Sequence, residues 1–477
     1  MTARRRPDPR RRGARAGLPA RAARAATLVM VAALAACTTP PAAAPLPPAV
    51  PARWLGSDGT ASVDARWWEN FGDPVLGALV DEALARNLDL RQAAARLDEA
   101  AALAAAQHGA ALPQLDGGAG VERLRDIGAA TGQPYYATNH AAQFQAAWEL
   151  DLRGRIDALE RAADADRAAL AAARDAVALS VAATVASGYF RLRALDAQLD
   201  LARRTLASRE RSLALTVARE RNGYGSTLES AQARAELRAT AQTLPELEQA
   251  IDAQQRALDL LLARAPGPIE RGRAIDALRP PALPGAGLPS QLLRRRPDLA
   301  SAEWQLTAAD ARFAAARAQL LPALRLTASF GSVGSSVLRG DPFGVWSIGG
   351  SVLAPLFNGG QLRALASASG SRRDQALIGY ERAVLTAFAE VELQLGARAR
   401  LDAQLAEVEA RRAATADALR IATRRHAEGY ASYLDELLAQ RSLFAVEQQW
   451  LQLRADRLAT DVALYRALGG GWGDAAR

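Results

Sequence analysis

A short turn sequence occurs twice in this chain, each time between two long runs that have the composition of helices. The first copy, Gly-Tyr-Gly-Ser-Thr-Leu-Glu, occupies 223–229, and the second, Gly-Tyr-Ala-Ser-Tyr-Leu-Asp, occupies 429–435. Glycine tolerates the left-handed conformation that ends a helix. The Ser-x-x-Glu and Ser-x-x-Asp that follow are typical of a capping box, which begins the next helix. The sequence therefore predicts two helical hairpins, whose turns hold Gly223, Tyr224, Gly429 and Tyr430.

The chain on either side of these turns is also duplicated. Residues 84–115 align with residues 293–324 at an offset of 209, and the offset has drifted only to 206 at the turns. In the first half, leucine and valine recur at steps of three and four from Pro74 to about Ala111, which predicts one helix. The duplication predicts the same element in the second half.

Alternating apolar and polar residues follow each of these helices, as in a strand with two different faces. In the first half, a loop is expected at Asp126–His140 and a strand after it, up to residue 152. In the second half, 324–330 and 346–352 alternate in the same way. The apolar positions hold four aromatic residues that are candidates for lipid-facing or interfacial anchors; the alternative is the core of a soluble sandwich. They are Phe144, Trp148, Phe330 and Trp346.

Long helices are expected between the strands and the turns. A continuous helix over 155–222 would be roughly 100 Å long at 1.5 Å per residue. After the first turn, apolar residues recur every seven positions from Leu237 to Leu258, which predicts packing against another helix. Pro245 is expected to interrupt this helix. Residues 264–289 are rich in proline and glycine and are predicted to be a linker.

The N-terminus has the features of a bacterial lipoprotein signal. Residues 1–36 combine a basic region with a short apolar segment, and Leu-Ala-Ala-Cys at 34–37 resembles a lipobox, in which Cys37 is acylated. The alternative is an unused thiol beside an ordinary cleavage site. The predicted organisation is a signal at 1–36, an acylated start and Pro/Ala-rich tether at 37–73, a first repeat at 74–263, a linker at 264–289, a second repeat at 290–468 and a tail at 469–477.

Composition excludes several classes of function. The net charge of +8 comes from the signal region, because residues 1–36 carry nine Arg and one Asp and the remaining 50 basic and 50 acidic residues cancel. A nucleic-acid partner is therefore not expected. The three histidines, His108, His140 and His426, lack metal-ligand spacing, so no metal is predicted. The sequence contains neither a nucleophile–base pair nor a phosphate loop, so it gives no indication of an enzyme or a cofactor.

Each half is expected to supply two strands, which either lie in water or form a barrel shared by several chains. Four strands cannot close a barrel, and an open edge in lipid would leave backbone groups unpaired. Three chains would supply twelve strands, which lies within the known range. No run of about twenty apolar residues follows the signal, so the sequence excludes a transmembrane helix.

Several motifs, in this order, resemble the TolC-type outer-membrane efflux channels, and among them the OprM-like (NodT-type) lipoprotein branch. The resemblance covers nearly all of the chain after the signal. It rests on Trp-Trp-Glu-Asn-Phe-Gly-Asp-Pro at 67–74, Trp-Glu-Leu-Asp-Leu at 148–152, Gly-Leu-Pro-Ser at 287–290, Arg-Pro-Asp-Leu at 296–299, Glu-Val-Glu at 390–392 and the segment 462–472.

The resemblance implies a mostly α fold with a small β part: a homotrimer in which a twelve-stranded β-barrel, four strands per chain, continues into a long periplasmic α-helical barrel. The linker would lie in an equatorial belt. It also implies a lipid-anchored location in the outer membrane, extending into the periplasm, and contact with membrane lipid. The implied function is passive export of drugs, toxic compounds or metals, with a periplasmic adaptor and an inner-membrane pump as partners.

Glu229 and Asp435 match acidic positions that the resembled family places at the periplasmic constriction. Three carboxylates on a threefold axis would attract cations and raise one another's pKa. Both acids also complete capping boxes, and the two roles are compatible. The turns themselves, at the inner end of the tube, are expected to contact the adaptor.

Two alternative functions remain at this point. The same architecture serves as an exit duct for type I protein secretion, although the lipobox and the motifs disfavour it. A periplasmic coiled-coil lipoprotein without a pore would explain the helices, but it would not explain the alternating strands.

Overall fold

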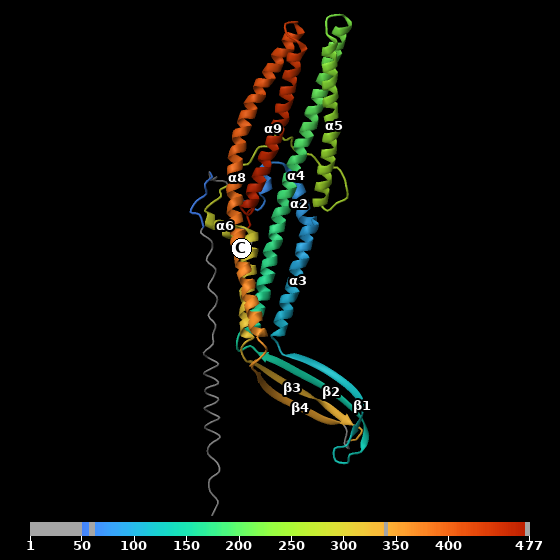
Figure 1. Cartoon of the computed structure of the whole chain (residues 1–477), viewed down its shortest axis with the longest axis vertical. Coiled ribbons are helices and arrows are strands. Elements are labelled where there is room, and N and C mark those ends of the chain that lie inside the picture. The colour runs from blue at the N-terminus through green and yellow to red at the C-terminus, as the bar shows by residue number, and fades with distance from the viewer. Residues whose placement is uncertain (1–49, 57–62, 338–341, 473–477) are drawn as a thin grey trace, which may run out of the picture. The chain divides into compact units, whose positions relative to one another are not determined.

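A computed structural model describes residues 50–56, 63–337 and 342–472, all within one compact unit, Leu46–Arg477. Cys37 and the predicted signal lie outside the described residues. Both helical hairpins end on the side opposite the strands (Figure 1). In chain order the elements are η1 (Trp67–Phe71), α2 (Pro74–Arg86), α3 (Leu88–Ala110), β1 (Gln114–Ile127), β2 (Pro134–Leu150), α4 (Arg155–Arg221), α5 (Thr227–Leu261), α6 (Pro289–Arg295), α7 (Pro297–Ala318), β3 (Ala323–Ser335), β4 (Phe343–Leu353), α8 (Gln361–Ala427) and α9 (Tyr433–Ala467).

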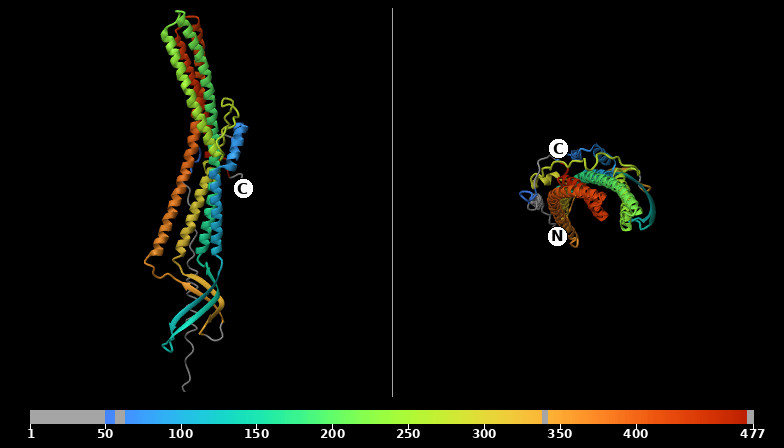
Figure 2. Two further views of the ribbon diagram at one scale, coloured as in Figure 1. Left: turned by 90° about the vertical axis from the view of Figure 1, so that its right-hand side faces the viewer. Right: turned by 90° about the horizontal axis from the view of Figure 1, so that it is seen from above.

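The two halves repeat each other in element length. The helices before the turns, α4 and α8, have 67 residues each, and those after the turns, α5 and α9, have 35 each. α4 and α8 both begin after a glycine in the left-handed conformation, Gly154 and Gly360. Viewed from above, the long helices of this unit lie along an arc, as a sector of a tube would (Figure 2).

The single helix predicted from Pro74 to Ala111 is wrong, because the chain breaks at Asn87 between α2 and α3. The Asn87 side chain accepts a hydrogen bond from the Leu90 amide at 3.1 Å and donates to the Leu261 carbonyl at 2.9 Å. A side chain that caps a new helix competes with continuation of the old one. Arg296, 209 positions later, separates α6 from α7, but its side chain does not cap α7.

Two further expectations about helices are corrected. α5 continues through Pro245 without interruption. The exclusion of a membrane-spanning helix was too strong, because α4 is long enough and contains a stretch apolar enough to cross a bilayer by composition alone. The buried face of α4 explains this stretch: Val185, Tyr189 and Phe190 are fully buried against other elements of the chain.

The four strands form one antiparallel sheet in the order β1-β2-β3-β4, and the register of each pair is continuous. The loop predicted at Asp126–His140 is much shorter, since β1 continues to Ile127, which pairs with Pro134. Gly128 donates its amide to the Gln133 carbonyl at 2.9 Å and closes the hairpin. Apolar and polar residues alternate only weakly in this segment, because small and polar residues occupy both faces of the two strands.

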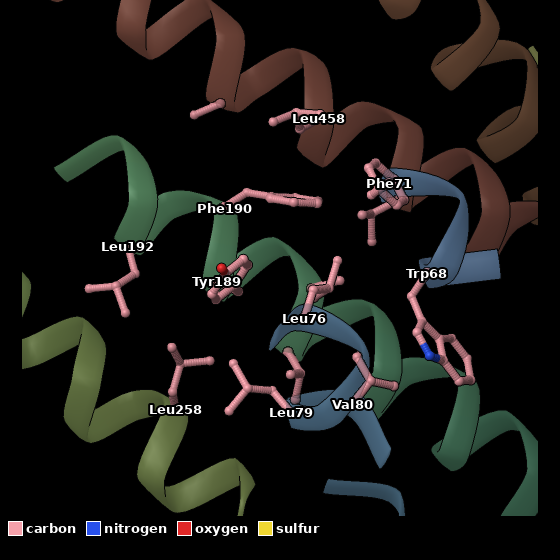
Figure 3. Close-up of a cluster of buried hydrophobic side chains, with 14 of the residues drawn as sticks. Trp68, Phe71, Leu76, Leu79, Val80, Tyr189, Phe190, Leu192, Leu258 and Leu458 are labelled. Carbon is pink, nitrogen blue, oxygen red and sulfur yellow. The ribbon is translucent and has the colours of Figure 1, made fainter. Parts of the chain in front are cut away.

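The main hydrophobic core joins η1, α2, the middle of α4, the end of α5 and α9 (Figure 3), and the linker packs against it through Ile269, Ile275 and Leu278. Asp73 caps α2 by accepting from the Val75 amide at 3.0 Å. Its carboxylate also accepts from the Tyr189 hydroxyl at 2.7 Å and from the Arg273 amide at 3.0 Å. A buried carboxylate needs such donors, so this one residue connects the start of α2, α4 and the linker.

Candidate functional site: paired helix turns and a two-faced sheet

The two turns have the predicted geometry. Gly223 and Gly429 adopt φ of 76° and 83°, the left-handed values that favour glycine at a helix end. After each glycine, the tyrosine amide returns to the preceding helix: Tyr224 donates to the Arg219 carbonyl at 2.9 Å, and Tyr430 donates to that of Arg425 at 2.8 Å. The two tyrosine side chains are 87% and 75% exposed, so each turn offers an aromatic ring to a partner.

Both acidic candidates complete capping boxes. The Glu229 carboxylate accepts from the Ser226 amide at 3.5 Å, and the Ser226 hydroxyl accepts from the Leu228 amide at 3.1 Å. The Asp435 carboxylate accepts from the Ser432 amide at 3.2 Å and from its hydroxyl at 3.1 Å. Asp435 is exposed and Glu229 is half-buried. The caps account for the acids at these positions.

Just behind the turns, Arg219 joins the ends of α4 and α8. Its guanidinium lies 2.9 Å from His426 Nε2 and donates to the Ala427 carbonyl at 3.3 Å. Carbonyls at a helix C-terminus carry partial negative charge, so a cation is favourable there. His426 is 5% exposed, and its ring packs edge-on to Tyr433. The residues near His426 in the sequence do not indicate this contact, because Arg219 lies 207 positions away.

A buried ionic cluster lies deeper between the hairpins. Glu236 of α5 contacts Arg209 of α4 at 3.1 Å and Arg441 of α9, whose Nε donates to it at 2.8 Å. Arg209 also lies over the ring of Phe444, 5.6 Å from its centroid. Burial lowers the pKa of Arg209, and the Glu236 carboxylate opposes this shift. One carboxylate therefore holds three of the four tip helices together.

The sheet has an apolar face and a polar face. Residues paired across an antiparallel sheet point to the same side, and Gly117, Phe144, Phe330 and Trp346 form one such row. The Phe144 and Phe330 rings stack at a centroid distance of 5.1 Å. Trp148 lies on the same side and donates from Nε1 to the Ala111 carbonyl at 2.9 Å.

The four candidate anchors are exposed on this apolar face: Phe144 is 48% exposed, Trp148 37%, Phe330 59% and Trp346 79%. A sandwich core would bury these rings. The soluble-sandwich alternative therefore fails for the described chain, and the apolar face needs lipid or another apolar partner.

Carboxylates lie only on the opposite, polar face of the sheet. β1 alternates so that Asp116, Glu122 and Asp126 share one side, and the register places Glu149 of β2 on that side too. Within the described strands, no Asp or Glu lies on the apolar face. This separation of charge is the pattern of a barrel wall with lipid outside and water inside.

In the part of the chain that the structure describes, no group of three or more His, Cys, Asp or Glu side chains is arranged to hold a metal ion. His108 lies 3.3 Å from both Asp164 and Glu160, and these carboxylates, Asp164 first, raise its pKa. This exposed group is an ordinary ion pair between α3 and α4.

Long paired helices that continue into a strand sheet with an exposed apolar face are the architecture of outer-membrane channels. Residues 79–264 and 288–470 match the family model described as outer membrane efflux protein, and the chain belongs to that family. The predicted family is confirmed, and the chain is an outer-membrane transport protein.

Among the relatives, the pyoverdine export outer membrane protein OpmQ of Pseudomonas aeruginosa is 36% identical over 450 residues, which cover 92% of this chain and 95% of OpmQ. The toluene efflux pump outer membrane protein TtgF of Pseudomonas putida is 36% identical over 425 residues, 87% of each chain.

Solved structures share the fold. The outer-membrane channel OprN superposes with a TM-score of 0.83 at 29% identity, over 90% of this chain and 99% of OprN. The open state of the MtrE outer membrane channel of Neisseria gonorrhoeae gives 0.79 at 30% identity, over 91% and 98%.

Proposed function

We propose that this chain forms the outer-membrane channel of a tripartite efflux system, through which small molecules leave the periplasm passively. The observation that carries the proposal is a four-stranded sheet with an exposed apolar face, attached to helices that lie along an arc. β1 and β4 are both edge strands. In lipid, such edges must pair with other strands, and three copies that pair β4 with the next β1 give a closed barrel of twelve strands.

The same threefold arrangement turns the helical arc into a tube. The polar face of the sheet then lines the lumen, where its carboxylates favour cationic over anionic solutes. A periplasmic adaptor would contact the exposed turns around Tyr224 and Tyr430, and an inner-membrane pump would drive export. The relatives named for pyoverdine and toluene export support small molecules as the class of cargo.

The tip is the proposed gate. Asp435 from three chains would meet near the axis, with Glu229 beside it, and the ionic cluster around Glu236 would hold the hairpins of each chain together. Opening then requires the hairpins to separate while their caps remain intact.

Cys37 is the proposed site of acylation, and it lies outside the described residues. A lipid on this residue would add a second membrane attachment to the barrel. Intact mass measurement of the mature protein tests it, because a Cys37→Ser variant must lose the lipid mass.

The function is tested with the purified full-length protein in planar bilayers. We expect stepwise conductance, and a heat-modifiable trimer on gels of the outer-membrane fraction. A water-soluble elongated monomer after removal of the lipid would contradict the channel and favour the coiled-coil lipoprotein.

A further inference from the structure

Only two charged side chains of the described strands lie on the apolar face of the sheet, and both are arginines at one end of β1. Arg123 and Arg125 share the side of Gly117, whose partner is Phe144. The third arginine of the strands, Arg325, lies on the polar face, opposite Glu149. His140 is also on the apolar face, paired with Val121. Arg123 and Arg125 therefore lie on the side of the sheet opposite to every strand carboxylate.

Their height on the sheet matches the edge of a bilayer. Arg123 pairs with Thr138, ten residues along β2 from Trp148. Ten residues span roughly 34 Å of strand, or about 25 Å of height at a tilt of 35–45°, which is the thickness of the apolar band of such barrels. Trp148 thus marks one interface and Arg123 the other. A charge in the middle of the band would be destabilising, whereas a charge at its edge is tolerated.

The surroundings of the arginines fit an interface. Both are exposed, and Arg125 lies 6.0 Å from the ring centroid of Tyr136, which is itself 64% exposed. Tyrosine is enriched where membrane meets water. Val121 and Ile127, on the same face, are 77% and 66% exposed, so apolar side chains flank the two guanidinium groups.

We propose that Arg123 and Arg125 bind the phosphate groups of the glycolipid that forms the outer leaflet of the outer membrane. A guanidinium group presents a planar pair of donors that matches a phosphate, and a nearby apolar surface accommodates the acyl chains. The strand end that carries the arginines is the one farthest from the helices (Figure 1). The inference rests on the proposed function, because the helices must be periplasmic for this end to face the outer leaflet.

The test uses the full-length trimer and three probes: lipid A with two phosphates, the same lipid without phosphates, and phosphatidylglycerol. Native mass spectrometry measures how much of each lipid the trimer retains. We expect retention of bisphosphorylated lipid A to fall about fivefold for each of Arg123→Gln and Arg125→Gln, with the losses multiplying in the double variant. Arg325→Gln removes the same charge from the polar face and should leave retention unchanged.

Equal retention of bisphosphorylated lipid A by the wild type and the double variant would overturn the inference. Equal binding of phosphatidylglycerol and bisphosphorylated lipid A by the wild type would overturn the assignment to the glycolipid. Conductance of the same proteins separates this result from the proposed function. A wild type that conducts but shows no arginine-dependent retention refutes the lipid site alone, whereas a wild type that forms no pore refutes the channel.

Discussion

The two helical hairpins have helices of the same lengths, but they contribute different charges to the contact between them. Arg219 and His426 are 207 positions apart, and Glu236 and Arg441 are 205 apart, close to the 206-residue offset of the turns. Nearly equivalent positions of the two halves therefore meet in space. Identical side chains there would oppose like with like, at a cost in free energy. At both contacts the side chain of one hairpin differs in charge from the one that it meets, so like charges do not face each other.

Removal of the Glu236 carboxylate should weaken the contact between the two hairpins more than any other change proposed here. Glu236→Ala leaves Arg209, 5% exposed, without its anion. We expect the free energy of opening between the hairpins to fall by about 3–5 kcal/mol, the usual cost of an unpaired buried charge. Hydrogen exchange of the backbone amides of α5 and α9 measures it. Glu246→Ala, an exposed position on the same helix, is the control; equal exchange in the two variants would contradict the prediction.

A second difference between the halves concerns Asp461, whose equivalent in the first half is Gln255. Asp461 is fully buried beside Arg457 and 3.4 Å from Arg398. Burial raises the pKa of Asp461 to about 6, and the two arginines oppose the rise. Since the folded state favours the protonated carboxyl, this stabilisation is present below about pH 4 and is lost as the pH rises through 6.

The Asp461→Asn variant should therefore lose less stability than the wild type between pH 4 and pH 7, by about 2–3 kcal/mol. Thermal unfolding followed by circular dichroism at both values measures the difference. Parallel changes in the two proteins would show that the arginines keep Asp461 ionised in the fold.

Substitutions of the two turn acids, Asp435 and Glu229, should have the smallest effects. Asp435→Asn keeps a hydrogen-bond acceptor for the cap, whereas Asp435→Ala removes it at a cost of roughly 0.5–2 kcal/mol. If Asp435 lines the gate, both variants lose cation preference in single-channel recordings. Glu229→Gln, at the half-buried equivalent, should change conductance less. Unchanged conductance and selectivity in Asp435→Asn would leave this residue with a capping role alone.

Local chemistry made the turns predictable from the sequence. Gly223 and Ser226 determine a helix end and a helix start within a few residues, so the capping boxes are found as predicted. The break at Asn87 could not be found in this way, because its side chain bonds to Leu261, 174 positions away. The contact of Arg219 with His426 also depends on how distant helices pack. Only the duplication could have indicated this contact, because its offset brings Arg219 close to the position of His426 in the other half.

Only part of the sheet, too, could be predicted from the sequence. Alternation revealed the apolar face around Phe144 and Phe330, but the small residues of β1 concealed most of that strand. The sorting of Arg123 from Glu122 became visible only once the register was known. The apolar stretch of α4 shows a further limit, because a helix that packs against a core and a helix that spans a membrane can share a composition.

The main core brings together the first and last elements of the folded unit. Trp67 stacks on Tyr465 at a centroid distance of 5.4 Å, and Trp472 donates to Asp175 at 2.9 Å. Contacts between residues so far apart in the chain form late, since the intervening loop must close first. An exported chain therefore cannot complete this core until its last helix has crossed the inner membrane. The order of translocation thus delays completion of the fold until all four strands are available.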